Sequence, residues 1–169
     1  MYLIFDTETT GLPQNWKAPL TDFDNWPRLV QLAWQVHDLE GKLVDVKNYI
    51  IKPEGFDIPF NASKIHGIST ERALQEGMPL LEVLEIFMQD IEKAKFVVGH
   101  NISFDNSIVG CEFLRKSIPN LLQSIPAIDT KNDATDFCKI PGGRGGKFKW
   151  PSLTELHEKL FESTFSQAH

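Results

Sequence analysis

Residues 3–13 read Leu-Ile-Phe-Asp-Thr-Glu-Thr-Thr-Gly-Leu-Pro, and this stretch decides the fold. Residues 2–6 form a short apolar run that ends in a carboxylate, which is typical of a buried strand. Asp6 and Glu8 lie two positions apart at the end of that strand, so their side chains project to the same side of a sheet. The following Thr-Thr-Gly turns the chain sharply, and we expect it to present backbone N–H groups beyond the two carboxylates.

Two neighbouring carboxylates resist ionising together, and a hard divalent cation removes that penalty. The pair Asp6 and Glu8 is therefore a candidate metal site. A bare Asp-x-Glu pattern is common, however, and its structural interpretation is a solvated strand end followed by polar turn residues. The pair gains meaning only in combination with a second motif.

A second strand-to-helix junction supplies another carboxylate. Residues 97–105 read Val-Val-Gly-His-Asn-Ile-Ser-Phe-Asp, a buried strand that runs into the first turn of a helix containing Asp105. Ligands bind at the strand ends of open α/β sheets, which makes Asp105 a candidate ligand. The alternative is that this Asp only complements the helix dipole, because a carboxylate in the first turn stabilises a helix.

The rest of the chain alternates strands and helices. Strands are expected over residues 2–6, 28–37, 42–51, 95–99 and 125–128. Helices are expected over residues 79–93, 101–116, 131–138 and 152–162, the last two opened by Asp129 and by a Ser152–Glu155 capping box. This order predicts an α/β fold, a mixed five-stranded sheet with three antiparallel N-terminal strands and then two parallel ones, flanked by helices.

Length and composition limit the class of protein. The 169 residues suffice for one domain with one core, and the formal net charge of −6 argues against broad contact with phosphates unless bound cations offset some acids. Cys111 and Cys138 make no disulfide framework. The N-terminus has no basic region, and no stretch approaches the roughly 20 apolar residues of a membrane span. We therefore expect a cytoplasmic protein with no membrane contact.

Taken together, the motifs resemble a known family. Asp-x-Glu-Thr-Thr-Gly at residues 6–11 and His-Asn-x-x-Phe-Asp at residues 100–105 resemble motifs I and II of the DEDD superfamily of 3′→5′ exonucleases. Ile-His-Gly-Ile-Ser at residues 65–69 is similar to a segment that lies between them in this family. The likeness is greatest to the DEDDh branch, which includes the proofreading epsilon subunit of bacterial DNA polymerase III. It runs from residue 3 to the end of the chain and implies a ribonuclease H-like fold.

The resemblance implies a site in which four carboxylates hold two divalent cations, Mg²⁺ or Mn²⁺. Asp6, Glu8 and Asp105 match the first three ligands, and His169 matches the histidine that acts as general base five residues before the fourth. The alternative for His169 is a surface residue or the start of a tag. We expect residues 1–169 to be one exonuclease domain cut off within its third motif, with weak metal binding or activity in the chain as printed. Asp129 is interpreted as a helix cap rather than the fourth ligand.

The resemblance also implies contacts to the 3′-terminal nucleotide. They are assigned to the turn residues and to three residues elsewhere: Thr9, Thr10, Gly11, Leu12, His66, Asn101 and Phe104. Leu12 would wedge against a base. Structural interpretations stay open for the last three, since His66 can bond its own turn, Asn101 can cap a helix and Phe104 can belong to the core.

The glycine-rich loop over residues 139–149 has two interpretations. Its basic residues are Lys139, Arg144, Lys147 and Lys149. They suit the phosphates of a single strand, and they suit a mobile solvated loop equally well. The aromatic residues of the irregular stretch 13–27 could likewise stack bases, although packing over a sheet edge is the simpler use.

The main functional hypothesis is an enzyme. It hydrolyses terminal phosphodiesters of nucleic acid, single-stranded DNA before RNA, as in proofreading or repair, and releases nucleoside 5′-monophosphates. Its partners are a single-stranded 3′ end and, as a further candidate, a DNA polymerase subunit. The alternative is a non-catalytic nucleic-acid-binding or polymerase-docking module of the same fold. A nucleotidase or kinase would leave Glu8 and the second motif without a role.

Overall fold

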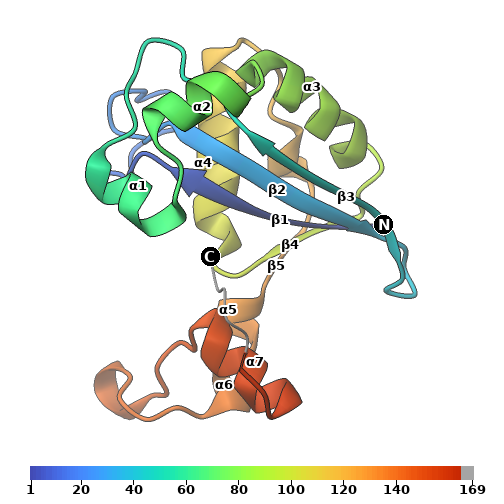
Figure 1. Ribbon diagram of the computed structural model, residues 1–169. Coiled ribbons are helices and arrows are strands. Elements are labelled where there is room, and N and C mark those ends of the chain that lie inside the picture. Colours follow the sequence, from blue (N-terminus) through green and yellow to red (C-terminus); the bar gives the residue numbers. More distant parts are fainter. Residues whose placement is uncertain (165–169) are drawn as a thin grey trace.

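The computed structural model describes residues 1–164 and contains one mixed sheet, in the strand order β3-β2-β1-β4-β5 (Figure 1). The strands are β1 (Tyr2–Thr9), β2 (Leu29–His37), β3 (Leu43–Ile50), β4 (Phe96–Gly99) and β5 (Ala127–Asp129). The first three pair antiparallel, β4 runs parallel to β1, and β5 runs parallel to β4. The predicted five-stranded mixed sheet is therefore confirmed.

Strand β1 continues three residues past its expected end because its polar continuation still alternates. Thr7 and Thr9 are buried on the core side, whereas Asp6 is exposed on the other side. Glu8 has the same parity as Asp6, so both project to that second face, as the spacing predicts. The pairing with β2 shifts register between Glu8 and Thr9, and such a bulge re-aims the chain where β1 enters its turn.

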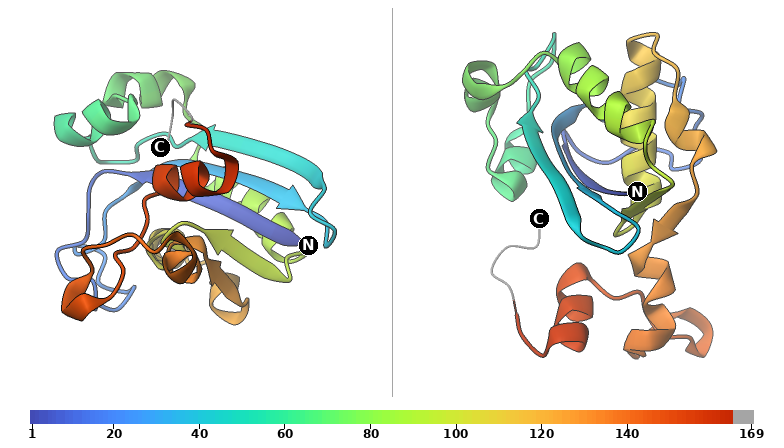
Figure 2. Two further views of the ribbon diagram at one scale, coloured as in Figure 1. Left: turned by 90° about the horizontal axis from the view of Figure 1, so that it is seen from below. Right: turned by 90° about the vertical axis from the view of Figure 1, so that its right-hand side faces the viewer.

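One face of the sheet is covered by two helices, α3 (Leu80–Ile91) and α4 (Ile102–Arg115), as the side view of Figure 2 shows. Phe87 and Phe113 are fully buried between these helices and the strands. Both helices agree with the predicted ranges to within one or two residues. The core thus holds β1 and β4 side by side. Helix α4 begins at Ile102, shortly after β4 ends at Gly99.

Two short helices, α1 (Phe60–His66) and α2 (Thr70–Glu76), are not predicted by the sequence patterns. Each is only seven residues long, too short for a helical hydrophobic period to stand out. Their buried residues, Ala62 in α1 and Ala73 in α2, belong to a second, smaller cluster. Its other members come from β2 and from the connecting segments: Val30, Ile58 and Ile68.

The C-terminal helices form a small unit beneath the second face of the sheet (Figures 1 and 2). They are α5 (Thr130–Asp133), α6 (Thr135–Cys138) and α7 (Leu153–Phe161), so the single helix expected over 131–138 is broken in two. The short 3₁₀ turns are η1 (Leu121–Ser124) and η2 (Arg144–Gly146). The Ser152–Glu155 capping box of α7 is confirmed. No helix within residues 1–164 has the length and apolar character needed to cross a membrane.

Candidate active site

Asp105 is the best-fixed carboxylate at the junction of β1 and α4. It lies in the first turn of α4, and only 3% of the residue is exposed. The backbone N–H of Thr7 donates to its Oδ1 atom at 3.0 Å, and the Thr7 hydroxyl donates to the same atom at 2.6 Å. Because Thr7 stands between Asp6 and Glu8, these two bonds lock the carboxylate of α4 against the strand that carries the other two.

The electrostatics of this junction disfavour negative charge. Burial raises the pKa of Asp105 to about 7, and Asp6 raises it as well, against the lowering effect of the Thr7 hydrogen bonds. The side chain of Asp6 is exposed, yet surrounding protein atoms withdraw its carboxyl from bulk water and raise its pKa too, while the Thr7 backbone and His100 lower it. Two carboxyls with raised pKa values, one of them raised in part by the charge of the other, form a site that a cation would stabilise.

His100 is a third component of the junction, and it has no predicted role. It follows β4 directly, with Nε2 3.0 Å from the carbonyl oxygen of Pro151 and Nδ1 3.1 Å from the Thr130 hydroxyl. It also lines, with Asp6, a hollow of about 660 Å³ on the second face of the sheet. The available signal was its position, since it is the first polar residue after a buried strand.

The turn after β1 is stabilised by its own threonines. The Thr9 hydroxyl donates to the Gly11 carbonyl at 2.6 Å, and Thr10 exchanges two bonds with Arg28, each of 2.9 Å. The backbone N–H of Thr10 therefore donates to Arg28, and the expectation that this group faces a ligand is wrong. Leu12, in contrast, is 71% exposed and stands clear of the core.

The other predicted substrate residues have contacts within the protein. His66 ends α1, and its Nδ1 accepts from the backbone N–H of Ile68 at 3.2 Å, which agrees with the structural interpretation. Asn101 stands at the N-cap of α4 with a left-handed backbone (φ 74°), but its side chain does not cap the helix and instead contacts Lys131. Phe104 is half-buried, with its ring centroid 5.6 Å from that of Trp16.

The structure also shows the environment of two carboxylates in the C-terminal part of the chain, Asp129 and Asp133. Asp129 caps α5, and its Oδ1 accepts from the backbone N–H groups of Lys131 (3.0 Å) and Asn101 (2.9 Å), so its interpretation as a cap is confirmed. Asp133 is exposed in α5. The predicted general base, His169, lies outside the described residues.

The oxygen donors of this site suit a hard divalent cation such as Mg²⁺. Asp6 and Asp105 interact electrostatically, and both carboxyls carry a raised pKa that bound positive charge would relieve. Within residues 1–164, His, Cys, Asp and Glu side chains do not gather in threes close enough to hold an ion as they stand.

The exonuclease family RNase_T matches residues 3–165. This chain belongs to that exonuclease family. The match confirms the family resemblance that the sequence motifs indicate.

Two similar proteins are PolC-type DNA polymerases III of Streptococcus pyogenes, from serotype M2 (strain MGAS10270) and serotype M18 (strain MGAS8232). Each is 34% identical over 129 residues, which make up 76% of this chain. The chain spans only 8% of the length of these polymerases.

Among solved structures, Exonuclease I of E. coli shares the fold. Its complex with a dT13 oligonucleotide gives a TM-score of 0.66 at 20% identity, over 84% of this chain and 30% of that one. Its complex with a dA16 oligonucleotide gives 0.72 at 18% identity, over 99% of this chain and 36% of that one.

Proposed function

We propose that this chain is a metal-dependent 3′→5′ exonuclease that hydrolyses terminal phosphodiesters of single-stranded nucleic acid, DNA in the first place, and releases nucleoside 5′-monophosphates. The observation that carries this proposal is the buried Asp105, held by Thr7 beside Asp6 at the junction of β1 and α4. Family membership supplies the reaction class, since the chain matches exonucleases over almost its whole length.

Asp6, Glu8 and Asp105 would hold two divalent cations, Mg²⁺ or Mn²⁺, which when bound orient the attacking water and stabilise the leaving oxygen. Thr7 fixes one oxygen of Asp105, so that the carboxylate keeps one orientation. A pKa of about 7 lets Asp105 give up its proton readily when positive charge arrives. His169 would act as the general base, in a single domain over residues 1–169.

The 3′-terminal nucleotide would lie between the turn after β1 and the first turn of α4. Leu12 and Phe104 present apolar surface there: Leu12 is largely exposed, and Phe104 lies beside the half-exposed Trp16. Asn101 adds an amide next to these groups, and His66 would contact the nucleotide from α1. Bases stack on such apolar and aromatic surfaces without regard to sequence, which suits an enzyme that removes any nucleotide.

The similar proteins suggest the process in which this chain acts. PolC-type polymerases carry a segment similar to this chain, and Exonuclease I has been solved with oligonucleotides and with SSB-Ct. We therefore propose that the protein acts in the cytoplasm on single-stranded DNA during replication or repair, with a DNA polymerase as a candidate partner.

The test uses 5′-labelled and 3′-labelled single strands of DNA and RNA, with Mg²⁺, with Mn²⁺ and with EDTA. It compares the full-length protein encoded by the gene, residues 1–169 alone, and Asp6→Ala, with Asp57→Ala as an exposed carboxylate control. We expect the full-length protein to give a ladder that shortens from the 3′ end and needs metal, and residues 1–169 alone to give a weak ladder or none. Asp6→Ala should lose the activity of the full-length protein, and Asp57→Ala should keep it. Strand binding without cleavage under any metal would replace the enzyme with the non-catalytic binding module.

A further inference from the structure

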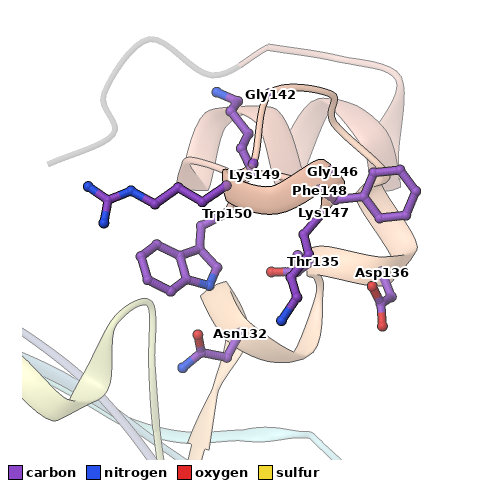
Figure 3. Close-up of a pocket in the computed structure, with 11 residues that line it drawn as sticks. Asn132, Thr135, Asp136, Gly142, Gly146, Lys147, Phe148, Lys149 and Trp150 are labelled. Carbon is purple, nitrogen blue, oxygen red and sulfur yellow. The ribbon is translucent and has the colours of Figure 1, made fainter.

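A second hollow lies outside the carboxylate site, between the helices α5 and α6 and the glycine-rich loop. Its volume is about 1030 Å³. Asn132, Thr135 and Asp136 line one side, and residues of the loop 142–150 line the other (Figure 3). This hollow is called the loop cleft below. None of its residues takes part in the chemistry proposed above.

The loop cleft is basic in a chain that is acidic. Its lining contains three basic side chains, Arg144, Lys147 and Lys149, and one acidic side chain, Asp136, whereas the whole chain has 17 basic and 23 acidic ones. Lys149 is paired with Glu155 at 2.7 Å. Arg144 and Lys147 also line the cleft, and within residues 1–164 neither has a carboxylate partner. Two unpaired cations at one opening attract a polyanion, and counterions condensed on its phosphates are released when it binds.

Trp150 places a flat apolar surface beside these cations. Its side chain is 63% exposed, and the Lys131 ammonium lies 4.6 Å from the ring centroid. A cation over the ring helps to fix the orientation of the indole. In Figure 3 the Lys147 side chain lies between Trp150 on one side and Phe148 on the other. Stacking surfaces interleaved with cations are what single-stranded nucleic acid requires of a binding groove.

The loop has no regular structure apart from η2, yet it is folded back on itself. The backbone N–H of Lys149 donates to the carbonyl of Ile140 at 2.8 Å and closes the loop at its base. A Cβ atom on Gly143 would lie 2.3 Å from the Phe148 carbonyl oxygen, so only glycine allows the two limbs to approach this closely. The closed loop holds its cations and aromatic rings in place before a ligand arrives, which lowers the entropic cost of binding.

Two lines of contact connect the loop cleft to the carboxylate site. Lys131, which packs on Trp150, donates to the side chain of Asn101 at the start of the helix that carries Asp105. On the other side, His100 beside Asp6 is bonded to the carbonyl of Pro151, the residue after Trp150. The cleft therefore lies next to the place where a strand end would be cut.

We infer that the loop cleft binds single-stranded nucleic acid upstream of its terminal nucleotide, with Trp150 stacking a base and with Arg144 and Lys147 contacting phosphates. The position of the cleft on the strand rests on the proposed function, whereas the binding surface does not. DNA and RNA share the backbone charge and the stacking faces of the bases, so the chemistry recognises both.

The test measures binding in EDTA, so that no cleavage occurs, with labelled DNA and RNA strands of about 12 nucleotides. Trp150→Ala is expected to raise Kd about tenfold, and Trp150→Phe to restore most of the affinity. Arg144→Gln with Lys147→Gln is expected to lower the slope of log Kd against log salt by about 1.4, because each phosphate contact on a single strand contributes about 0.7. Lys42→Gln with Lys52→Gln, two exposed lysines outside the cleft, removes the same amount of charge, serves as the control and keeps the wild-type slope.

Tryptophan emission adds a readout that a change in folding would not imitate. A strand that stacks on Trp150 quenches part of the emission, and Trp150→Phe removes that part while thermal unfolding confirms that the variant is folded. A wild-type Kd in both Trp150→Ala and the double variant would overturn the inference while leaving the exonuclease intact. Loss of binding in these variants of a protein that cuts nothing would support the cleft and end the proposed enzyme.

Discussion

The carboxylate site and the loop cleft are joined by contacts, yet they are built in opposite ways. Asp105 is 3% exposed and receives two hydrogen bonds from one residue of a central strand. Trp150 is 63% exposed and belongs to a loop that only glycines can close. Burial makes the negative charge of Asp105 costly and so favours a bound cation. Exposure leaves the basic side chains of the loop cleft hydrated and accessible to the phosphates of a nucleic acid. The carboxylate site is thus built to position the scissile phosphodiester bond, whereas the loop cleft is built to bind a single strand of any sequence.

The largest expected effect is a loss of hydrolysis that leaves strand binding unchanged. Asp6→Asn removes a charged oxygen donor, so we expect hydrolysis to fall by at least about 10³-fold, since metal ions contribute several kcal/mol to such transition states. Strand binding in EDTA should persist, because the loop cleft is untouched. Initial rates and anisotropy titrations on the same sample measure both quantities, with Asp57→Asn as the control. Equal loss of binding and cutting would mean that the two regions are not separate.

Thr7→Val tests the hydrogen bonds that fix Asp105. The substitution keeps the shape of the side chain but removes the hydroxyl that donates at 2.6 Å. We expect a loss of activity of about 10–100-fold, as is typical of partners that orient a metal ligand, and a higher Mg²⁺ concentration for half-maximal rate. Thr7→Ser should restore the Mg²⁺ dependence. A merely structural role would lower the melting temperature without moving that dependence.

The raised pKa of Asp105 predicts how stability depends on pH in the metal-free protein. The folded state holds a proton up to about pH 7, whereas the unfolded state releases it near the ordinary value of 3.8. The unfolding free energy therefore falls as pH rises between these values, and the loss is complete above the higher one. Asp105→Asn escapes this loss, so in EDTA its melting temperature should exceed that of wild type by several degrees at about pH 8, where each kcal/mol shifts Tm by roughly 2–4 °C.

Thermal melts of wild type and Asp105→Asn across this pH range measure the difference. It should shrink toward the acidic end, and added Mg²⁺ should narrow it at the alkaline end by stabilising wild type alone. A difference in melting temperature that stays constant at all pH values would mean that the pKa of Asp105 is not raised in the folded protein.

The smallest expected effect concerns the loop. Trp150→Ala removes an exposed side chain, and surface substitutions usually change stability by less than about 0.5 kcal/mol. We expect Tm to move by under about 2 °C, although strand affinity falls. A large drop in Tm would show that Trp150 packs as part of the fold rather than serving a ligand.

The sequence predicts the sheet because residues 2–6 form an apolar run that ends in a carboxylate, and because residues 28–37 alternate between apolar and polar side chains. It does not predict α1 and α2, since seven-residue helices depend on local caps and on burial against distant strands. Asp129 was recognisable as a cap because capping is a local pattern.

The candidate site was predictable only in part. Asp6 and Asp105 stand out as carboxylates at strand ends, but the bond between Thr7 and Asp105 spans 98 positions and leaves no local signal. The same holds for the contacts of His100 with Pro151 and of Lys131 with Trp150. Such pairings are set by packing, which is why the loop cleft becomes visible only in three dimensions.

The most direct test of the central claim compares linear and circular single-stranded DNA with Mg²⁺, using the full-length protein and its Asp105→Asn variant. An exonuclease whose site contains Asp105 shortens the 5′-labelled linear strand stepwise to nucleoside 5′-monophosphates, leaves the circle intact, and loses this activity in the variant. Nicking of the circle, or full activity in Asp105→Asn, would contradict the assignment of this junction as the site of a 3′→5′ exonuclease.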